Sequence, residues 1–579
     1  MNTNEKELTG YPSIDKPWLK YYSEEAINAP LPDCSMYEYL YDCNKDSLNH
    51  TAMNYFGKKI TYKKLFENID KVAAALQANG VKKGDIVSVC TLTAPETIYL
   101  LYAINKVGAV SNWLGLTSPV QDLHNQLDST DSRLVFVVEM AYDTIVEAAK
   151  GTKIEKIVSI PIEFSMQTAI KVAASLKNKH PVLNDISVRW KDFIESGTNT
   201  VFEPVGIDGN EMAVIEYTGG TTGVPKGVMI SNTAINSHYV NFFDTNKSGI
   251  FSFRNGDRFI SGVPLFLVFG LLAACHSPLC HSMELVLAPD PTPVSETKII
   301  LKYKINHVIA GRLQIEELIR QATQSGADLS YIHTLMYGGE ETNKLWENRV
   351  TDTLKNNNLN APLLNSYGMS ETSAGVLTAI DNDSNGLIPC ANVNVMITEP
   401  DDYAIEYGYN TEGELCISTK QLMIGYYKNE KETAETIFEK DGVKWLRTHD
   451  LARISKDGFI TITGRIKRIY SRTNSDMIQV RVYPMRIEEE LSKSEFVERC
   501  AVVGKKDDIV AYRSIAYIIL KDKSVDTETV KADLNKLSRD NLPESHIPDK
   551  YVFVDSFPLT RAGKVDYRAL EKMAGEMEE

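Results

Sequence analysis

The sequence has few cysteines and fewer basic than acidic residues. Eight cysteines are scattered along 579 residues, which excludes the dense disulfide framework of a small secreted protein and fits a reducing cytosol. Lysine and arginine total 62 against 77 aspartates and glutamates, so the formal net charge is −15. This balance disfavours nonspecific nucleic-acid binding, which needs clustered positive charge. We therefore expect a cytoplasmic protein with no nucleic-acid partner.

Segments that target or span membranes are also lacking. The first thirty residues are polar, without the apolar core of a signal peptide. The stretch Phe259–Met283 carries no Asp, Glu, Lys or Arg and is long enough for a membrane span, but Pro264, Gly270 and Pro278 interrupt it. We expect a buried strand, loop and helix beside the active site, and no transmembrane segment.

Length and patterning indicate a layered globular protein. At 43% hydrophobic and 24% charged residues, the chain is folded rather than disordered, and its length predicts two to four domains or subdomains. From Ile60 onward, amphipathic helical stretches such as Thr61–Asn79 alternate with short apolar runs such as Gly84–Cys90 and Leu134–Val138. That alternation predicts parallel α/β layers.

A glycine- and threonine-rich segment at residues 217–227 follows an apolar run, Met212–Ile215, that is typical of a strand. It reads Tyr-Thr-Gly-Gly-Thr-Thr-Gly-Val-Pro-Lys-Gly. Backbone N–H groups and threonine hydroxyls in such a loop can turn toward a polyphosphate, and Thr222 can also reach a magnesium ion. Pro225 stands where the common P-loop pattern needs glycine. A plain glycine-rich turn is the simpler alternative.

Seven further blocks follow this loop in a fixed order. They are 337–340 (Tyr-Gly-Gly-Glu), 365–371 (Asn-Ser-Tyr-Gly-Met-Ser-Glu), 413–415 (Gly-Glu-Leu), 425–427 (Gly-Tyr-Tyr), 448–450 (Thr-His-Asp), 464–465 (Gly-Arg) and 558–564 (Pro-Leu-Thr-Arg-Ala-Gly-Lys). Together with the loop they resemble the signature blocks of the adenylate-forming (AMP-binding) superfamily, which includes acyl-CoA synthetases such as fatty-acid–CoA ligases. The resemblance covers roughly residues 60–570.

The resemblance implies an α/β fold in two domains. The large N-terminal domain, residues 1–463, should consist of two α/β subdomains plus a distorted β-barrel and should bind AMP and the acyl group. Residues 1–30 are expected to be an extension that packs on its surface. The small α+β C-terminal domain, residues 464–579, should carry the catalytic lysine and move about a hinge near Lys467.

The resemblance also implies the residues of the ATP site. The loop would hold the β- and γ-phosphates, Thr222 and Glu371 would ligate Mg²⁺, and Tyr367 would stack on adenine. The full set of expected ATP- and AMP-binding residues is Thr218, Gly219, Gly220, Thr221, Thr222, Gly223, Lys226, Gly339, Glu340, Asn365, Ser366, Tyr367, Gly368, Ser370, Asp450 and Arg465.

Lys564 is the expected centre of catalysis, with Thr222 and Glu371. Attack of a carboxylate on the α-phosphate of ATP forms an acyl-adenylate and expels pyrophosphate. Two anions must approach each other, so the site has to supply positive charge. By resemblance, Lys564 reaches the α-phosphate and the substrate carboxylate. Rotation about Lys467 would then remove Lys564 and present another face of the small domain for thioester formation.

Three blocks depart from the family pattern. His449 replaces the usual glycine of Thr-Gly-Asp. Leu267 stands where the family often has a histidine after Pro-Leu-Phe, and this block also lacks the aspartate of amino-acid-activating domains. Residues 471–484 contain no glycine, whereas the family has a glycine turn there that lines the pantetheine tunnel.

The acyl pocket is expected to be mainly apolar, formed by His238, Phe266, Leu267, Gly338 and Ser366. An apolar residue at position 267 favours an acid without an α-amino group, and we expect a medium- or long-chain aliphatic acid. The predicted function is therefore activation of a carboxylic acid to acyl-AMP with ATP and Mg²⁺, followed by transfer to a thiol, for which CoA is the expected acceptor.

Two alternatives stay open. An acyl-AMP ligase could load a separate acyl carrier protein instead of CoA, because the turn after the hinge is altered. The second alternative is a non-catalytic nucleotide-binding scaffold derived from a synthetase. His449, Leu267 and the missing glycine turn favour it, because they depart from the family pattern. Retention of Lys564, Glu371 and the phosphate loop favours an enzyme.

Overall fold

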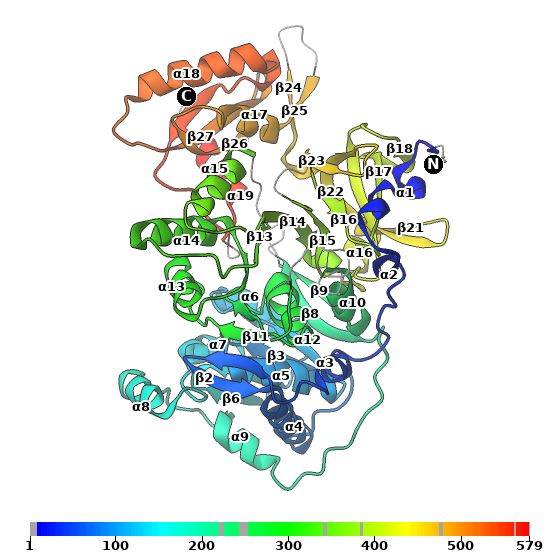
Figure 1. Ribbon diagram of the computed structural model, residues 1–579, viewed down its shortest axis with the longest axis vertical. Coiled ribbons are helices and arrows are strands. Elements are labelled where there is room, and N and C mark those ends of the chain that lie inside the picture. Colours follow the sequence, from blue (N-terminus) through cyan, green and yellow to red (C-terminus); the bar gives the residue numbers. More distant parts are fainter. Residues whose placement is uncertain are drawn as a thin grey trace.

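The computed structural model describes residues 8–218, 225–242, 253–339, 344–381, 386–473, 479–560 and 563–577, and the strand counts below refer to these residues. They form two large sheets flanked by helices, a smaller six-stranded sheet and a C-terminal domain that lies at one end of the molecule (Figure 1).

The first large sheet has eight strands. In sheet order they are β20 (Gly425–Tyr426), β9 (Lys226–Ser231), β8 (Met212–Thr218), β4 (Val110–Trp113), β3 (Ile86–Cys90), β5 (Leu134–Val138), β6 (Lys156–Ile160) and β7 (Ser187–Arg189). Neighbours from β8 to β7 are parallel, whereas β9 and β20 pair antiparallel. The central strands β4, β3 and β5 are almost entirely buried because helices cover both faces of the sheet.

The second large sheet has nine strands. In sheet order they are β16 (Ile388–Pro389), β15 (Ala374–Thr378), β14 (Leu363–Met369), β13 (Thr334–Gly338), β12 (His307–Ala310), β10 (Arg258–Ser261), β11 (Glu284–Leu287), β1 (Thr51–Tyr55) and β2 (Lys58–Thr61). The strands from β14 to β1 are parallel. Their carboxyl ends therefore share one edge, the place where open α/β sheets bind ligands.

Three apolar cores order these sheets and helices into five layers. Helices α6 (Val120–Ser129) and α7 (Tyr142–Ala148) cover the outer face of the eight-stranded sheet. Helices α13 (Pro293–Tyr303), α14 (Arg312–Ser325) and α15 (Lys344–Lys355) cover the outer face of the nine-stranded sheet. The largest core lies between the sheets and includes α3 (Met36–Asn44), α4 (Tyr62–Ala78), α5 (Pro95–Lys106), α9 (Trp190–Ser196) and α10 (Asn232–Phe242); α8 (Thr168–Lys177) lies nearer the surface.

The six-stranded sheet is a partly closed barrel wall. It contains β18 (Asp402–Tyr407), β17 (Asn394–Glu399), β19 (Gly413–Ser418), β22 (Val443–Ile454), β21 (Ile437–Lys440) and β23 (Ile460–Arg465), with the short helix α16 (Glu430–Thr436) before β21. All pairings within it are antiparallel. Together with the two α/β units, this sheet confirms the predicted fold of the large domain.

The C-terminal domain is an α+β unit, as predicted. Its elements are β24 (Tyr470–Thr473), β25 (Gln479–Val482), α17 (Pro484–Leu491), β26 (Val497–Asp507), β27 (Ala511–Leu520), α18 (Thr527–Asn541), β28 (Lys550–Phe553) and α19 (Tyr567–Gly575). Alternate residues of β26 face opposite ways: Val502 packs toward α17 and α18, whereas Val503 packs toward α19. Helices on both faces therefore bury the sheet.

The apolar stretch Phe259–Met283 folds as predicted into a strand, a loop and buried helical turns. After β10 come α11 (Val268–Leu271), a π-helical turn (Leu272–His276) and α12 (Ser277–Cys280), and the last two lie next to α10. In the part of the chain that the structure describes, no helix is long and apolar enough to cross a membrane.

The N-terminal extension packs more deeply than expected. It contains α1 (Pro12–Asp15), a 3₁₀ turn (Pro17–Tyr21) and α2 (Glu24–Ile27). Trp18 is fully buried, and its backbone lies so close to Gly458 that an added Cβ there would come within 2.6 Å of it. Tyr22 donates a hydrogen bond to the Pro389 carbonyl at 2.9 Å. Trp18 therefore belongs to the main core and braces the turn between β22 and β23, and the division of the chain at residue 30 stays a prediction.

We predict that Trp18→Ala lowers the melting temperature of the protein, because removing a fully buried tryptophan costs about 3–5 kcal/mol. Differential scanning fluorimetry measures the change. The matched control is Tyr11→Ala, which removes an exposed aromatic ring from the same extension and should shift stability by no more than about 0.5 kcal/mol. Equal melting temperatures for the two variants would contradict the bracing role.

Candidate active site

The predicted phosphate loop closes a hairpin between two strands of the eight-stranded sheet. Thr218, the last residue of β8, pairs with Lys226, the first residue of β9, and Tyr217 pairs with Gly227. The loop itself lies outside the described residues, and with it the predicted ligands Gly219, Gly220, Thr221, Thr222 and Gly223. The hairpin fixes where both ends of the loop emerge.

A chain of charged and hydroxyl groups runs from the base of this loop to Glu371. The Lys226 ammonium forms an ion pair with Glu432 and lies 4.8 Å from the centre of the Tyr426 ring. The Tyr426 hydroxyl donates to the Glu371 carboxylate at 2.7 Å. The Lys226 contact holds the pKa of Glu432 below its ordinary value. One carboxylate oxygen of Glu371 thus accepts from tyrosine, which orients a nearly buried acid beside the loop.

Strands β13 and β14 carry the next group of predicted residues to the same edge. Gly338 pairs with Ser366, and the neighbouring Tyr337 pairs with Asn365. A Cβ on Gly338 would lie 2.5 Å from the Ser366 carbonyl oxygen, so only glycine fits there. Gly339 follows with φ +83, which turns the chain away from the sheet. The predicted Glu340 lies outside the described residues.

The structure brings Tyr367, Asp450 and Arg465 together. The Tyr367 hydroxyl donates to one Asp450 oxygen at 2.6 Å, and the Arg465 Nε lies 3.3 Å from the other. Asp450 and Arg465 face each other across the antiparallel pair β22–β23. Burial, and then the neighbouring Asp450 charge, raise the pKa of Tyr367. Its ring is therefore neutral and held at one end, leaving a flat apolar face.

His449 keeps a backbone conformation that glycine usually supplies. Its φ is +58, in the left-handed region where residues with a Cβ are strained. Glu414 stabilises it: the His449 N–H donates to Glu414 Oε1 at 3.0 Å, and the imidazole Nδ1 lies 3.2 Å from the same oxygen. The departure from Thr-Gly-Asp thus preserves the placement of Asp450.

Lys564 reaches this edge from the C-terminal domain. A Cβ built on Gly339 would lie 3.5 Å from Lys564 Cε and 3.7 Å from its Nζ, so the side chain lies against the backbone of Gly339. Thr560 holds the turn that presents it: the Thr560 N–H donates to the Lys564 carbonyl at 2.7 Å, and the Thr560 hydroxyl accepts from the Lys564 N–H at 3.2 Å.

The link between the large domain and the C-terminal domain lies near Lys226, the first residue of β9. After Arg465 the chain makes a 3₁₀ turn, Ile466–Arg468, before β24 begins. Burial, and then the positive charge of Lys226, lower the pKa of Lys467, so the two lysines lie near each other. Two ion pairs join the domains further out: Arg486 to Glu412 at 2.9 Å and Arg481 to Asp401 at 3.1 Å.

The expected acyl-pocket residues are only partly brought together. His238 is fully buried on α10, where Nδ1 lies 2.9 Å from the Ser277 hydroxyl and burial lowers the pKa of the ring to about 3. Its ring stacks on Phe242 at 5.5 Å. A Cβ on Gly375 would lie 2.9 Å from the Phe242 ring and 3.1 Å from the Ser366 hydroxyl. Phe242 therefore connects His238 with Ser366.

The remaining pocket candidates, Phe266 and Leu267, follow β10 at its carboxyl end and are half-buried. A Cβ on Gly115 would lie 3.9 Å from the Phe266 ring, which places Phe266 toward the eight-stranded sheet. Gly368 and Ser370, the last two predicted ATP ligands, lie at and just beyond the end of β14. The roles of all these residues remain predictions.

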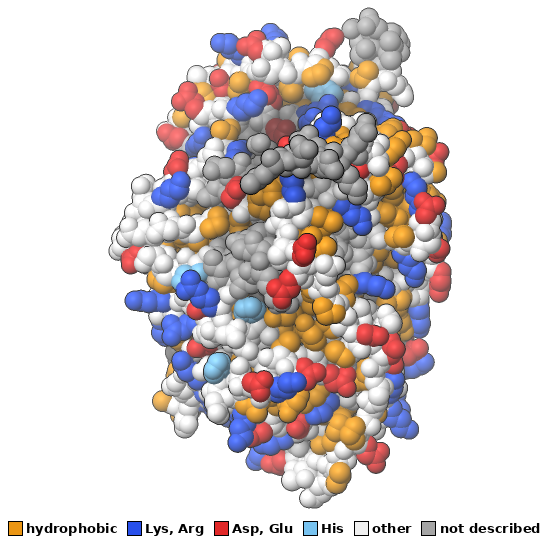
Figure 2. Space-filling model, turned by 45° about the vertical axis from the view of Figure 1, so that its right-hand side comes forward, with side chains coloured by type: hydrophobic (Ala, Val, Ile, Leu, Met, Phe, Trp, Pro, Cys, Tyr) orange, Lys and Arg blue, Asp and Glu red, His pale blue; other side chains and the backbone are white. Residues whose placement is uncertain are grey.

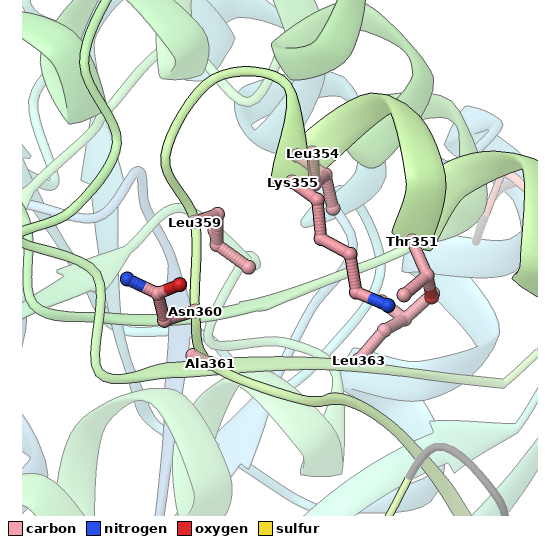
Figure 3. Close-up of a pocket in the computed structure, with 7 residues that line it drawn as sticks. All are labelled: Thr351, Leu354, Lys355, Leu359, Asn360, Ala361 and Leu363. Carbon is pink, nitrogen blue, oxygen red and sulfur yellow. The ribbon is translucent and has the colours of Figure 1, made fainter.

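Surface cavities elsewhere do not involve the predicted site. One cavity lies between the end of α15 and the start of β14 (Figure 3), lined by Thr351, Leu354, Lys355, Leu359, Asn360, Ala361 and Leu363. It opens near the amino end of β14, whereas the predicted residues gather at the carboxyl end. On the face shown in Figure 2, basic side chains are interspersed with acidic ones, an arrangement unlike a nucleic-acid-binding stripe.

Sequence reasoning missed Tyr426, Glu432 and Phe242. Tyr426 belongs to a recognised block, but its bond to Glu371 depends on β20 pairing beside β9. Glu432 is one of several acids around α16, and nothing in the sequence distinguishes it. Phe242 ends a helix that is buried on all sides. The spacing of apolar residues in this helix therefore does not distinguish Phe242 as a contact of Gly375.

Comparisons with known proteins identify the family of this chain. The family model of the AMP-binding enzyme matches residues 41–427, and that of the AMP-binding enzyme C-terminal domain matches residues 486–564. The chain is 26% identical over 574 residues to a long-chain-fatty-acid–CoA ligase of Bacillus subtilis, covering 96% of this chain and 97% of the relative.

Solved structures show the same fold. ATP-bound MatB from Rhodopseudomonas palustris superposes with a TM-score of 0.79 at 19% identity, covering 94% of this chain and 99% of that one. The anthranilate CoA ligase AuaEII in complex with anthranoyl-AMP gives a TM-score of 0.78 at 19% identity, covering 95% and 98%. The resemblance predicted from the sequence is confirmed, and since the first family model alone spans more than half of the chain, this protein belongs to the adenylate-forming family of AMP-binding enzymes.

Proposed function

We propose that the protein is an AMP-forming acid–thiol ligase, which converts a carboxylic acid to an acyl-adenylate with ATP and then passes the acyl group to CoA. The observation that carries this proposal is the position of Lys564 against Gly339, at the edge that also holds Tyr367, Asp450 and Arg465. A cation delivered by one domain to the nucleotide edge of another is suited to a reaction between two anions.

The nucleotide would lie along the carboxyl ends of β13 and β14. Its adenine would pack on the neutral Tyr367 ring, opposite Gly338, Gly339 and Glu340. Its ribose hydroxyls would bond to Asp450, which Arg465 holds in place. The phosphates would lie toward the hairpin loop, where Lys226 would exchange its Glu432 partner for phosphate oxygens. The Lys226 charge is thus already desolvated and oriented before the nucleotide arrives.

Glu371 fits a magnesium ligand. It is a nearly buried carboxylate beside the loop, and the Tyr426 hydroxyl orients it through one oxygen, which leaves the second oxygen for a hard cation. Thr222 would add a hydroxyl ligand. When bound, Mg²⁺ supplies positive charge that offsets the repulsion between phosphates and incoming carboxylate.

Lys564 would bridge the carboxylate and the α-phosphate, because a compact ammonium can contact oxygens of both. As the carboxylate oxygen attacks phosphorus, the bond to pyrophosphate breaks. The ammonium stabilises the negative charge that develops on the α-phosphate oxygens. We propose a domain boundary near residue 464 and Lys467 as the hinge that later withdraws Lys564 so that the thiol can approach the adenylate.

We propose a medium- or long-chain aliphatic acid as the substrate. Leu267 offers no hydrogen bond to a polar substituent, and Phe242 and Gly375 add apolar surface beside Ser366. The Bacillus subtilis relative named above is a long-chain-fatty-acid–CoA ligase, which supports this choice. We also place the protein in the cytoplasm, because all eight cysteines are free thiols.

CoA is proposed as the acceptor in preference to a carrier protein. The altered post-hinge segment folds into the hairpin β24–β25, and residues 474–478 at its tip lie outside the described part of the chain. Product analysis with a fatty acid, ATP and either free CoA or an acyl carrier protein separates the two acceptors. Saturable formation of acyl-CoA supports the proposal, and thioester formed only on the carrier would overturn the choice of CoA.

We predict that Lys564→Ala lowers the rate of acyl-adenylate formation by about 10²–10³, the usual cost of removing one group that stabilises transition-state charge. ATP affinity should change little, since the adenine and ribose contacts remain. Acid-dependent pyrophosphate release measures the first quantity and calorimetry the second. Lys572→Ala, which changes an exposed lysine of the same domain, is the matched control. A near-normal rate in Lys564→Ala would refute its role.

We also predict that Arg486→Glu slows adenylation by less than about fivefold. The variant breaks the ion pair with Glu412 that favours this domain orientation, and partly exposed pairs contribute about 1 kcal/mol or less. The double variant Arg486→Glu/Glu412→Arg restores the opposite charges and should recover the rate. If the double variant is as slow as the single one, the ion pair does not set the orientation.

A further inference from the structure

Three metal-capable side chains meet at the edge of the nine-stranded sheet opposite the active site. Asp257 immediately precedes β10, His307 is the first residue of β12, and His333 immediately precedes β13. These three strands are parallel neighbours. Their amino ends therefore lie side by side, and residues far apart in sequence converge there.

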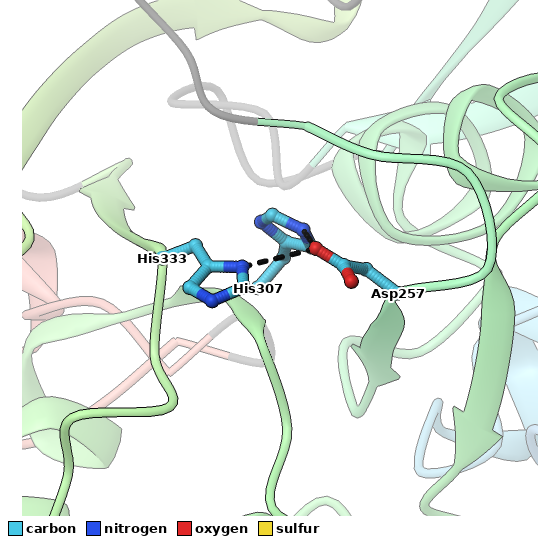
Figure 4. Close-up of side chains that lie close together, drawn as sticks. All are labelled: Asp257, His307 and His333. Carbon is cyan, nitrogen blue, oxygen red and sulfur yellow. Dashed lines mark hydrogen bonds and ion pairs between the residues drawn. The ribbon is translucent and has the colours of Figure 1, made fainter.

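Both imidazoles point at one carboxylate (Figure 4). His307 Nε2 and His333 Nδ1 each lie 3.0 Å from the same oxygen of Asp257, Oδ2. One ligand atom from each residue lies within 4.8 Å of the other two. The His307 side chain is fully buried, whereas Asp257 and His333 are partly exposed, so the cluster opens to solvent on one side.

We propose that Asp257, His307 and His333 form a binding site for one divalent d-block metal ion, of which Zn²⁺ is the natural probe. Two imidazole nitrogens and one carboxylate oxygen are a donor set that suits Zn²⁺ and its neighbours better than Mg²⁺ or Ca²⁺, which prefer oxygen ligands. Three protein ligands and a water molecule complete a tetrahedron.

The spacing of the donors fits such an ion. Ligands about 2.0–2.1 Å from tetrahedral zinc lie roughly 3.3 Å apart. Each imidazole nitrogen, now 3.0 Å from Oδ2, therefore needs to move from that oxygen by only a few tenths of an ångström, and the two nitrogens lie within 4.8 Å of each other.

Two features limit the expected affinity. His307 Nδ1, which must carry the proton when Nε2 binds a metal, is buried without a hydrogen-bond partner among the described residues. Exposed Arg254 is near enough for its positive charge to act on His307, so it also opposes a cation. We therefore expect a weaker site than the closed four-ligand centres of zinc fingers.

The position of the cluster indicates a stabilising role. Gly338 and Gly339 lie at the carboxyl end of β13, whereas His333 lies at its amino end. A metal here would tie β10, β12 and β13 together without touching the nucleotide. Binding to the folded state alone raises its stability by linkage. The proposal does not depend on the adenylation chemistry.

The test uses the full-length protein, freed of metal with a chelator and titrated with Zn²⁺ in the presence of excess Mg²⁺. Calorimetry gives the affinity and scanning fluorimetry the melting temperature. The variants His333→Ala and Asp257→Asn change partly exposed ligands and spare the buried His307. The matched control is His180→Ala, from a second group of potential ligands, Glu139, Glu163 and His180, that has only one imidazole.

We expect one equivalent of Zn²⁺ to bind and to raise the melting temperature. Each ligand variant should weaken binding by at least about tenfold, the lower end of what loss of even a supporting group costs a metal site, and His180→Ala should bind as the unmodified protein does. Circular dichroism checks that the variants are folded. Absence of Zn²⁺ binding, or equal affinity in the ligand variants, would show that the cluster is only a pair of Asp–His hydrogen bonds.

Discussion

The approach of Lys564 to Gly339 is the contact on which the rest of the proposed site depends. The backbone of Gly339 has φ +83, a conformation that residues with a Cβ rarely adopt, and the Lys564 side chain lies against it at ordinary contact distance. The contact also requires the C-terminal domain to dock so that the Thr560 turn presents Lys564 to the sheet edge. The ion pairs of Arg481 and Arg486 with the large domain favour that orientation, and each is weak enough to break in the proposed rotation of the domain.

Basic side chains of the proposed site pair locally with acidic ones, although the protein as a whole is acidic. The net charge is −15, yet the predicted phosphate region holds Lys226, Lys467 and Arg465. Before nucleotide binds, Glu432 pairs with Lys226 and Asp450 pairs with Arg465, so neither cation is left as an uncompensated charge of the kind that costs most when solvent is excluded. A nucleotide that replaces Glu432 at Lys226 exchanges one anion for another, and this limits the cost of opening the pair.

The sequence predicted the α/β layers from the alternation of helix-like and strand-like apolar patterns. It predicted the barrel-like sheet and the α+β C-terminal domain from the order of the family blocks. The family blocks also assigned Tyr367, Asp450 and Arg465 to one nucleotide site, and the structure brings these residues together, although their roles stay predictions. Contacts made by residues outside the recognised motifs were not predicted. Glu432 and Phe242 lie on helices without a distinctive pattern, and the burial of Trp18 depends on how the N-terminal segment packs against the turn at Gly458, far along the chain. The Asp257–His307–His333 cluster escaped for the same reason: strand pairing, not spacing in sequence, brings it together.

The most direct test of the account is acid-dependent exchange of labelled pyrophosphate into ATP, measured with Mg²⁺ over a panel of aliphatic, aryl and amino acids. The account predicts exchange that depends on the acid, is strongest with medium- or long-chain aliphatic acids, and leads to acyl-CoA when CoA is added. A protein that binds ATP but exchanges no pyrophosphate with any acid of the panel would contradict it and would favour a nucleotide-binding scaffold.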